Sequence, residues 1–438
     1  MGEGADTFAT LLGILDSAIE KFPDTRKGKN KSYSVRDATL SAFSVFFTQS
    51  PSFLSFQRSM ELNKGNNNGR TLFGIDKIPC DNQIRNILDP VSPEHLCPVF
   101  DAIKNLLQEK KILEQYRSFN NTFLIPLDGT YFFSSGAIHC PSCSSKKHRD
   151  GTVSYFHSAI TPVIVAPGNP RVIALAPEFI SPQDGAEKQD CENAAAKRWI
   201  ARWGPQYAKL GVTILGDDLY CKQPVCELLL AHKLNFILTC KPSSHPWLSE
   251  WLGIADPVED LHEFSLKVWT GKEQHTYTYR YANQVPLKDG EKALQVNWAE
   301  LIITNQKGEQ IYRNSFATNH LITRENVEAL VAAGRCRWKI ENENNNTLKT
   351  KGYHLEHSFG HGEQYLSNLL LTLNLLAFLF HTVLEIFDQR YRLIRHTLSR
   401  RDTFFHDIRA LTRYICFDGW TQLLQFMLRG LELEDPGG

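Results

Sequence analysis

Three acidic patches, far apart in the chain, constrain its fold more than any other feature. They lie in LIPLDGTYFF, VTILGDDLY and RCRWKIENENNNTLK, and their central acids are Asp128, Asp217 and Glu341. Asp128 and Asp217 each follow a short apolar, β-prone run, so each carboxylate is expected at the end of a strand. Glu341 lies in a helix-like stretch crowded with Arg, Lys and Trp. A fold that brings these three elements together would gather three carboxylates at one point.

Carboxylates that converge in this way suit metal-dependent chemistry. Hard divalent cations prefer oxygen ligands. Two such ions in one site can activate a nucleophile and stabilise a leaving oxygen in phosphoryl transfer. The three acids therefore predict an enzyme that cuts and joins nucleic acid.

The composition is that of an ordinary globular protein. The chain has 438 residues, of which 42% are hydrophobic and 22% are charged. Its formal net charge is zero, so a surface that binds a polyanion must come from local clustering. Ten cysteines and a start that does not read as a secretory signal predict reduced thiols and an intracellular protein. The apolar run Leu369–Phe380 is too short to span a bilayer and predicts a buried core helix in a soluble protein.

Residue patterns divide the chain into four regions with different expected structure. Strands that come first and then alternate with helices favour a mixed α/β sheet, and a later group of strands joined by turns favours a β-rich insertion. The expected regions are a helical N-terminal part (1–118), the α/β part (119–244), the β-rich insertion (245–330) and a helical part that carries Glu341 (331–438).

The N-terminal region has two alternative interpretations. Within it, residues 63–70 (NKGNNNGR) are expected to form a solvated basic loop, in which Lys64 and Arg70 could contact a phosphate backbone. Short helices with such a loop favour a DNA-binding head. A helical packing or dimerisation domain explains the same pattern.

The acidic motifs together resemble those of a known family. DGTYFF, GDDLY and R-W-K-I-E followed by L-K, with strands before the Glu, are similar to motifs of DDE-type transposases of bacterial insertion sequences. The resemblance covers residues from about 120 to 385 and is closest to the group whose third motif combines Tyr, Arg, Glu and Lys. The chain departs from that motif at Gly334, which takes the Tyr position, and at Lys349, which comes one residue late.

This resemblance implies a fold and roles for particular residues. The expected fold class is α/β, with an RNase H-like catalytic domain split by the β insertion and flanked by helical regions. Asp128, Asp217 and Glu341 would be the catalytic ligands of two Mg²⁺ or Mn²⁺ ions, while Arg337 and Lys349 would bind DNA. Two alternatives stay open, because Asp218 and Glu343 lie beside the preferred residues.

The resemblance also implies an activity and partners. The activity would be cut-and-paste transposition, with double-stranded DNA at the element's terminal inverted repeats and at the target as substrate. A homodimer acting in the bacterial cytosol, without a membrane partner, would carry it out. The alternatives are a related nuclease or recombinase that does not transfer strands, and a domesticated, non-catalytic DNA-binding protein.

A second group of residues favours a structural zinc ion. Cys140 and Cys143 form a Cys-x-x-Cys knuckle, and His148 and His157 could complete a Cys₂His₂ shell. The spacing between the two His is longer than usual for paired ligands, and Cys191 is another candidate ligand. Ordinary reduced thiols in a loop are the alternative interpretation.

Further acids lie between the first two motifs. Glu178, Glu187, Asp190 and Glu192 precede an Ala-rich helix expected from about Asn193. They could cap that helix, or one of them could reach the metal site. The sequence does not single out which.

Overall fold

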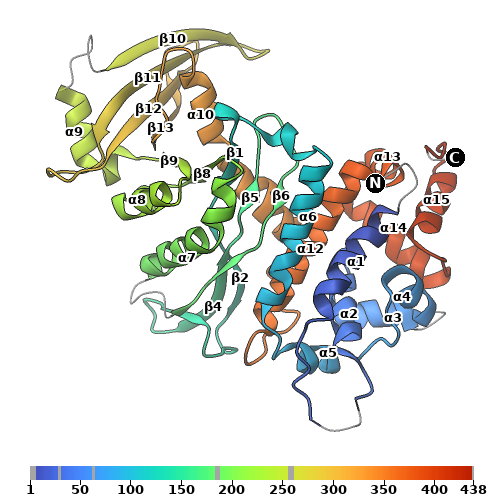
Figure 1. The fold of residues 1–438 in the computed structure, drawn as a ribbon. Coiled ribbons are helices and arrows are strands. Elements are labelled where there is room, and N and C mark those ends of the chain that lie inside the picture. Colours follow the sequence, from blue (N-terminus) through green and yellow to red (C-terminus); the bar gives the residue numbers. More distant parts are fainter. Residues whose placement is uncertain (1–5, 28–30, 62–64, 183–187, 255–260, 437–438) are drawn as a thin grey trace.

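The computed structural model describes residues 6–27, 31–61, 65–182, 188–254 and 261–436. They form a mixed α/β protein with one large sheet, a smaller sheet and many helices. The strands occupy one side of the molecule, and helices from both ends of the chain lie together on the other side (Figure 1).

The large sheet has seven strands in the order β1-β8-β9-β13-β12-β11-β10. Their bounds are β1 Phe123–Pro126, β8 Val212–Gly216, β9 Asn235–Thr239, β13 Gln310–Thr318, β12 Gln295–Thr304, β11 Gln274–Pro286 and β10 His262–Trp269. Neighbours β1, β8 and β9 run parallel, and every later pair is antiparallel. β1 and β8 are buried along their whole length, as expected for parallel strands that are covered on both faces.

A smaller sheet begins where β1 ends. It contains β2 Gly129–Ser135, β4 Val153–Ile160, β3 Ser144–Lys147 and β7 Glu178–Ile180. β4 pairs antiparallel with β2, β3 and β7. Only Leu127 and Asp128 separate β1 from β2, so the chain passes from one sheet into the other at this acid. A short pair, β5 Val163–Ile164 and β6 Ile173–Ala174, lies beside β1.

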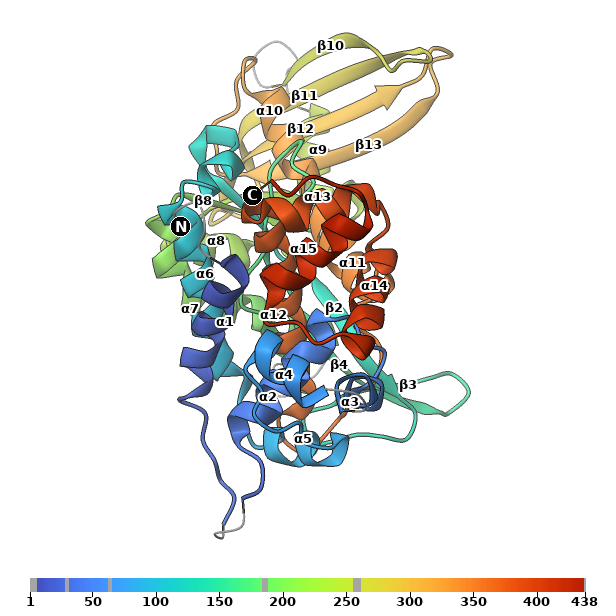
Figure 2. The same cartoon turned by 90° about the vertical axis from the view of Figure 1, so that its right-hand side faces the viewer.

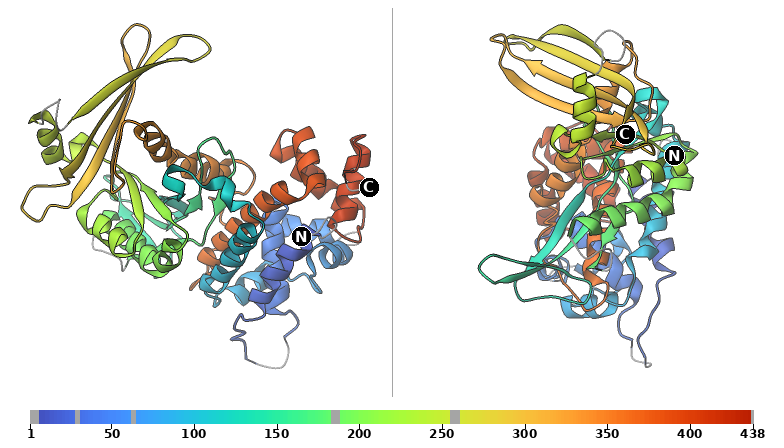
Figure 3. Two further views of the ribbon diagram at one scale, coloured as in Figure 1. Left: turned by 45° about the horizontal axis from the view of Figure 1, so that its top comes forward. Right: turned by 90° about the vertical axis from the view of Figure 1, so that its left-hand side faces the viewer.

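Helices connect the parallel strands, as such connections require. α7, Lys188–Ala208, runs between β7 and β8, and α8, Gln223–Ala231, runs between β8 and β9. Beyond β9 the chain forms α9, Pro246–Ile254, and then the antiparallel strands β10 to β13, which extend the large sheet away from the helical side (Figures 1 and 3).

The helical side is built from both ends of the chain. The N-terminal helices are α1 Thr7–Ile19, α2 Val35–Phe47, α3 Phe53–Glu61, α4 Gly65–Phe73, α5 Asp81–Leu88, η1 Pro93–Leu96, α6 Cys97–Glu109, η2 Leu113–Tyr116 and η3 Phe119–Asn121. The C-terminal helices on this side are α12 Leu366–Phe387, α13 Gln389–Thr397, α14 Arg401–Tyr414 and α15 Trp420–Gly430. The other helical elements are η5 Pro242–Ser244, α10 Val327–Arg335, η6 Ile340–Asn345 and α11 Asn346–Thr350, of which α10 packs on β9, β11 and β12 of the large sheet.

The two ends share one apolar core. Aromatic rings interlock across them, with centroids 4.9 Å apart for Phe43 and Phe380 and 5.1 Å apart for Phe47 and Trp420. Figure 2 shows the N-terminal helices in blue beside the C-terminal helices in red.

The prediction of a basic loop at residues 63–70 is wrong for residues 65–70, which lie in α4. Lys64 is outside the described residues. The helix forms there because Leu72 and Phe73, at its end, are buried in this core.

α12 is the central helix of this side. By length and composition it could cross a membrane, but 89% of its most apolar window is buried inside the protein. It packs on α1 and α2. The apolar run was expected to be a buried core helix, and its placement here agrees.

Candidate active site

Asp128 and Asp217 follow neighbouring parallel strands. In the β1–β8 register Pro126 pairs with Leu215, so the acid two residues further along each strand lies at the same edge. The ladder continues past β1, where the Leu127 N–H donates to the carbonyl of Leu215 at 2.9 Å. Parallel strands end on one side of a sheet, which is where open α/β sheets place their ligand sites.

Glu341 reaches the same place from the helical segment after α10. It lies in η6, a π-helical turn, which is a rare and wide form of helix often found at functional sites. Arg337 lies one turn earlier, and its Nη1 is 2.5 Å from Glu341 Oε1 and 3.9 Å from Asp128 Oδ1. The guanidinium therefore lies between the first and third acids.

Glu192 of α7 adds a fourth carboxylate. The hydroxyl of Tyr220 donates to Glu192 Oε1 at 2.8 Å, and the Gly129 N–H donates to the same oxygen at 3.2 Å. Both donors are neighbours in sequence of the strand-end acids Asp128 and Asp217. The sequence left Glu192 as one of four candidates. The side chains of Glu187 and Asp190 are outside the described ones, and Glu178 pairs instead with Arg198 at 2.9 Å.

The pKa of Asp128 reflects both its burial and its charged neighbours. Burial is the main cause that raises this pKa, to about 7 in all, with Arg337 opposing the rise and the charges of Glu192, Glu341 and Asp217 adding to it. A raised carboxyl pKa indicates that negative charge at this place lacks compensation. A hard divalent cation, which prefers oxygen ligands, would supply it. Arg337 lies between Asp128 and Glu341. Among the described residues, the two groups of possible metal ligands whose donor atoms all lie within 4.8 Å of each other consist of Cys and His and contain none of these carboxylates.

The neighbouring acids differ in their contacts. Asp218 turns toward the loop after β9, where its Oδ1 accepts the Lys241 N–H at 2.7 Å and lies 3.5 Å from His245 Nε2. Asp217 Oδ1 accepts the Leu219 N–H at 2.9 Å, and its charge acts on Asp128. This geometry favours Asp217 over Asp218 as the acid that shares a site with Asp128.

The two basic residues expected to bind DNA have protein partners. Arg337 contacts the carboxylates described above. Lys349 Nζ pairs with Glu356 Oε1 at 2.9 Å, in the segment that follows α11. Glu341 is singled out from Glu343 by its ion pair with Arg337.

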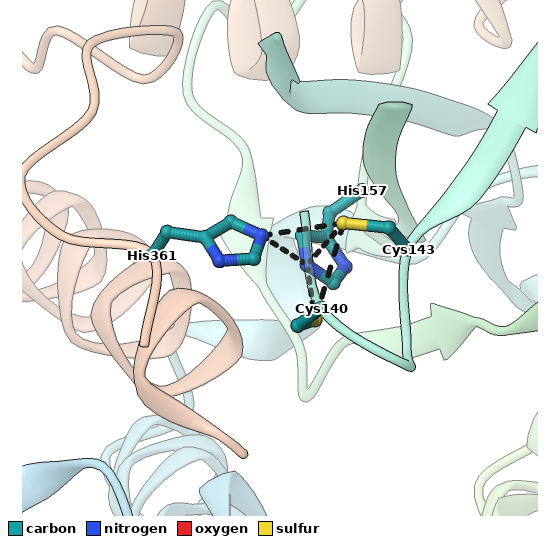
Figure 4. A group of neighbouring side chains, drawn as sticks. All are labelled: Cys140, Cys143, His157 and His361. Atoms are coloured by element: carbon teal, nitrogen blue, oxygen red, sulfur yellow. Dashed lines mark hydrogen bonds between the residues drawn. The ribbon is translucent and has the colours of Figure 1, made fainter. Parts of the chain in front are cut away.

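The predicted zinc ligands are only partly brought together. Cys140, Cys143 and His157 form one buried group, and its fourth member is His361, from the segment before α12 (Figure 4). The assignment of His148 is wrong, because this residue lies in the turn between β3 and β4, where its Nε2 bonds to Ser154 Oγ at 2.8 Å. The side chain of Cys191 is outside those described. His361 follows His157 by 204 residues, so no local spacing could reveal it.

Comparisons with known proteins give structural likenesses among solved structures. No family model matches the sequence, and no curated protein is significantly similar to it. Among solved structures, the chain resembles the piggyBac transposase in a cryo-EM synaptic complex with hairpin DNA. The TM-score is 0.37 at 8% sequence identity, and the match covers 99% of this chain and 80% of that chain. A shared fold does not follow from a score this low, so the assignment of the site rests on the contacts above.

Proposed function

We propose that this protein is a DDE-type transposase whose active site is formed by Asp128, Asp217 and Glu341. The observations that carry the proposal are that Asp128 and Asp217 follow neighbouring parallel strands, and that Arg337 contacts both Asp128 and Glu341. Burial and neighbouring charge raise the pKa of Asp128 to about 7, which marks a place where a cation would replace a proton.

The fold supports an RNase H-like core. β1 and β2 together act as one bent strand, which pairs antiparallel with β4 on one side and parallel with β8 on the other. β7 and β9 then flank this set, so the local order is β7-β4-β1/β2-β8-β9, with Asp128 at the bend. In such a core the first acid would lie on the central strand and the second on the neighbouring strand.

The residues of the site have separable roles in the proposed reaction. When bound, two Mg²⁺ or Mn²⁺ ions would lower the pKa of the attacking water and stabilise the leaving oxygen. Asp128 and Asp217 hold fixed positions at strand ends, and Glu341 closes the site from the helical side. Glu192, held by Tyr220 and Gly129, orients the segment at Asp128. Arg337 can exchange its carboxylate partners for a DNA phosphate when cations neutralise the acids.

The chemistry consists of two in-line displacements at phosphorus. Water attacks the phosphodiester at the end of the element, and the bond to the 3′-oxygen breaks to leave a 3′-hydroxyl. That hydroxyl then attacks a phosphodiester of the target DNA, and a target 3′-oxygen leaves as the new bond forms. The protein positions the groups and stabilises charge without forming a covalent intermediate. A homodimer in the bacterial cytosol, acting on paired ends, is part of the proposal.

The test uses the inverted repeats that flank the gene as labelled DNA. With Mg²⁺ the protein should cut at the repeats, leave 3′-hydroxyl ends and join pre-cut ends to a plasmid. Asp128→Asn, Asp217→Asn and Glu341→Gln should each lose cleavage by about 10³-fold or more while DNA binding persists. Asp218→Asn and Glu343→Gln are the matched controls and should keep it.

Two results would overturn the proposal or narrow it. Cleavage that persists in any of the first three variants would remove that residue from the active site. Cleavage by the unchanged protein without any joining of pre-cut ends would make it a nuclease rather than a transposase.

A further inference from the structure

The group formed by Cys140, Cys143, His157 and His361 lies outside the carboxylate site. Cys140 and Cys143 belong to the turn between β2 and β3, where the Cys143 N–H donates to the Cys140 carbonyl at 3.1 Å. His157 is in β4, and His361 is in the segment between α11 and α12. Figure 4 shows the four side chains pointing toward a common centre from these three places.

The spacing of the donor atoms matches a tetrahedral ion. A Zn²⁺ ion with ordinary bond lengths requires about 3.8 Å between two sulfurs, about 3.6 Å from sulfur to nitrogen and about 3.3 Å between two nitrogens. The two Sγ atoms are 3.9 Å apart, and the two Nε2 atoms are 3.3 Å apart. His157 Nε2 lies 3.5 Å from Cys140 Sγ and 3.4 Å from Cys143 Sγ, and His361 Nε2 lies 3.2 Å from Cys143 Sγ.

A second contact prepares His361 to act as a ligand. Its Nδ1 lies 2.8 Å from the carbonyl oxygen of Gly362, and the N–H must be on Nδ1 for this bond to form. The lone pair of Nε2 then faces the two sulfurs and His157. Metal-bound imidazoles usually carry such an outer hydrogen bond, which fixes the tautomer and the ring orientation.

The surroundings favour a structural ion over a catalytic one. Phe132 stacks on His157 at a centroid distance of 5.8 Å, and Phe133 lies 4.5 Å from the ring of His361. Two thiolates and two imidazoles fill a tetrahedral shell and leave no position for a substrate.

The position of His361 defines what the ion would hold together. The segment that carries it is also tied to the N-terminal helices, because Arg85 Nε donates to the Phe359 carbonyl at 2.9 Å. Asp89 accepts the N–H groups of Glu363 and Gln364 at 3.0 Å just before α12 begins. Residues 351–365 therefore form a junction between the smaller sheet, the N-terminal helices and the core helix.

We propose that Cys140, Cys143, His157 and His361 bind one structural Zn²⁺ ion, which fastens residues 351–365 to the β2–β4 sheet. The ion links Cys143 to His361, which lies 218 residues later in the chain. It would thereby fix the segment that leads from the Glu341 turn to α12. This inference is independent of the proposed cleavage of DNA.

The first test is the zinc content of the purified full-length protein after a wash with a weak chelator. The unchanged chain should retain about one Zn²⁺ per molecule, as a closed Cys₂His₂ site requires. Cys143→Ser and His361→Ala should lose it, and His361→Cys should keep it because a thiolate can replace the imidazole. His148→Ala is the matched control and should keep the ion.

A second group of donors gives an internal control. Cys221, Cys240 and His245 also lie within 4.8 Å of one another but offer three donors. Zinc that is lost in Cys240→Ser and retained in His361→Ala would overturn the proposal, as would unchanged zinc in His361→Ala or no zinc in the unchanged chain.

Cobalt gives a readout of which ligands hold the ion and in what geometry. Co²⁺ bound in place of zinc should show the visible absorption of a tetrahedral ion with thiolate ligands, and this spectrum should weaken in His361→Ala but not in His148→Ala. An octahedral spectrum without a thiolate band would contradict the site.

Discussion

The guanidinium of Arg337 lies 2.5 Å from Glu341 and 3.9 Å from Asp128, so a positive side chain stands between two acids of the proposed metal site. Under the proposed function, Asp128 and Glu341 would hold a cation that neutralises them in place of Arg337. The arginine would then be available to bind a phosphate.

Replacing Arg337 with Met should make the stability of the folded protein depend more strongly on bound divalent ions. Without divalent ions at pH 8, unfolding should become easier by about 1–3 kcal/mol, because the acids lose their partner. Mg²⁺ should then raise the Tm of the variant more than that of the unchanged protein, since binding stabilises the folded state. Arg335→Met is the control, because Arg335 instead lies over the ring of Tyr312 at 4.7 Å. An equal Mg²⁺-induced shift in Arg337→Met and the unchanged protein would contradict this role.

The raised pKa of Asp128 predicts how stability depends on pH. The pKa of this carboxyl is about 7 in the folded protein against an ordinary value of 3.8, so between these pH values the folded state holds a proton that the unfolded state has released. The stability of the ion-free protein should therefore fall as pH rises from about 4 to about 7 through this group. Asp128→Asn removes the penalty and should stabilise the ion-free protein by about 2 kcal/mol at pH 8, with no gain near pH 4.

Thermal unfolding of Asp128→Asn at both pH values, with and without Mg²⁺, checks this expectation. Mg²⁺ should stabilise the unchanged protein and not the variant. A gain that is the same at pH 4 and pH 8 would show that Asp128 titrates normally.

A substitution at Gly129 tests the role of Glu192, because the Glu192 carboxyl group lies against this glycine. A Cβ at position 129 would lie 2.8 Å from the Glu192 carboxyl carbon, whereas at Gly136 it would meet no atom of the described residues within 4 Å. Because the end of a Glu side chain can move, Gly129→Ala should displace the carboxylate with little loss of stability. Mn²⁺ affinity measured by calorimetry should fall by about tenfold in Gly129→Ala, in the range seen for lost outer contacts, and stay unchanged in Gly136→Ala. Unchanged affinity in Gly129→Ala would exclude Glu192 from the site.

Asn68 tests whether the N-terminal helices belong to the same folding unit as the C-terminal ones. Its buried side-chain amide donates to the carbonyls of Thr412 and Ile415 at 2.7 and 2.8 Å and accepts the N–H of Phe417 at 3.1 Å. Asn68→Ala should lower the free energy of unfolding by about 2–4 kcal/mol, because it leaves buried groups unpaired. Asn82→Ala, at an exposed position, should change it by less than about 0.5 kcal/mol. A separate transition for residues 1–118 in denaturant would contradict the shared core.

Much of the site was predictable because local patterns mark strand ends. LIPLD and VTILGD each combine a buried apolar run with an acid, so they locate both strands and both acids before the pairing is known. That the two strands are neighbours and parallel, and that Glu341 and Arg337 face Asp128, follows from the tertiary fold. Glu192 carries no comparable mark, because its partners Tyr220 and Gly129 come from other elements.

The zinc ligands show the same limit. Cys140 and Cys143 are close in sequence and could be recognised, but the fourth donor comes from a segment 218 residues after Cys143. His148 is closer to the two cysteines in sequence, but it lies in the turn between β3 and β4, away from them. The prediction of a loop at residues 65–70 is wrong for a similar reason. Their Gly and Asn content disfavours a helix, but packing stabilises one there.

The central claim is that Asp217, with Asp128 and Glu341, binds the metal ions that catalyse DNA cleavage. Replacing the Asp217 carboxylate with a thiolate tests this claim most directly. In Asp217→Cys the thiolate binds the hard Mg²⁺ ion poorly and accepts Mn²⁺ better. Cleavage of DNA that carries the flanking inverted repeats should therefore be lost in Mg²⁺ and recovered in Mn²⁺, while Asp218→Cys should cleave in both. Full cleavage by Asp217→Cys in Mg²⁺ would show that Asp217 holds no ion and would contradict the account.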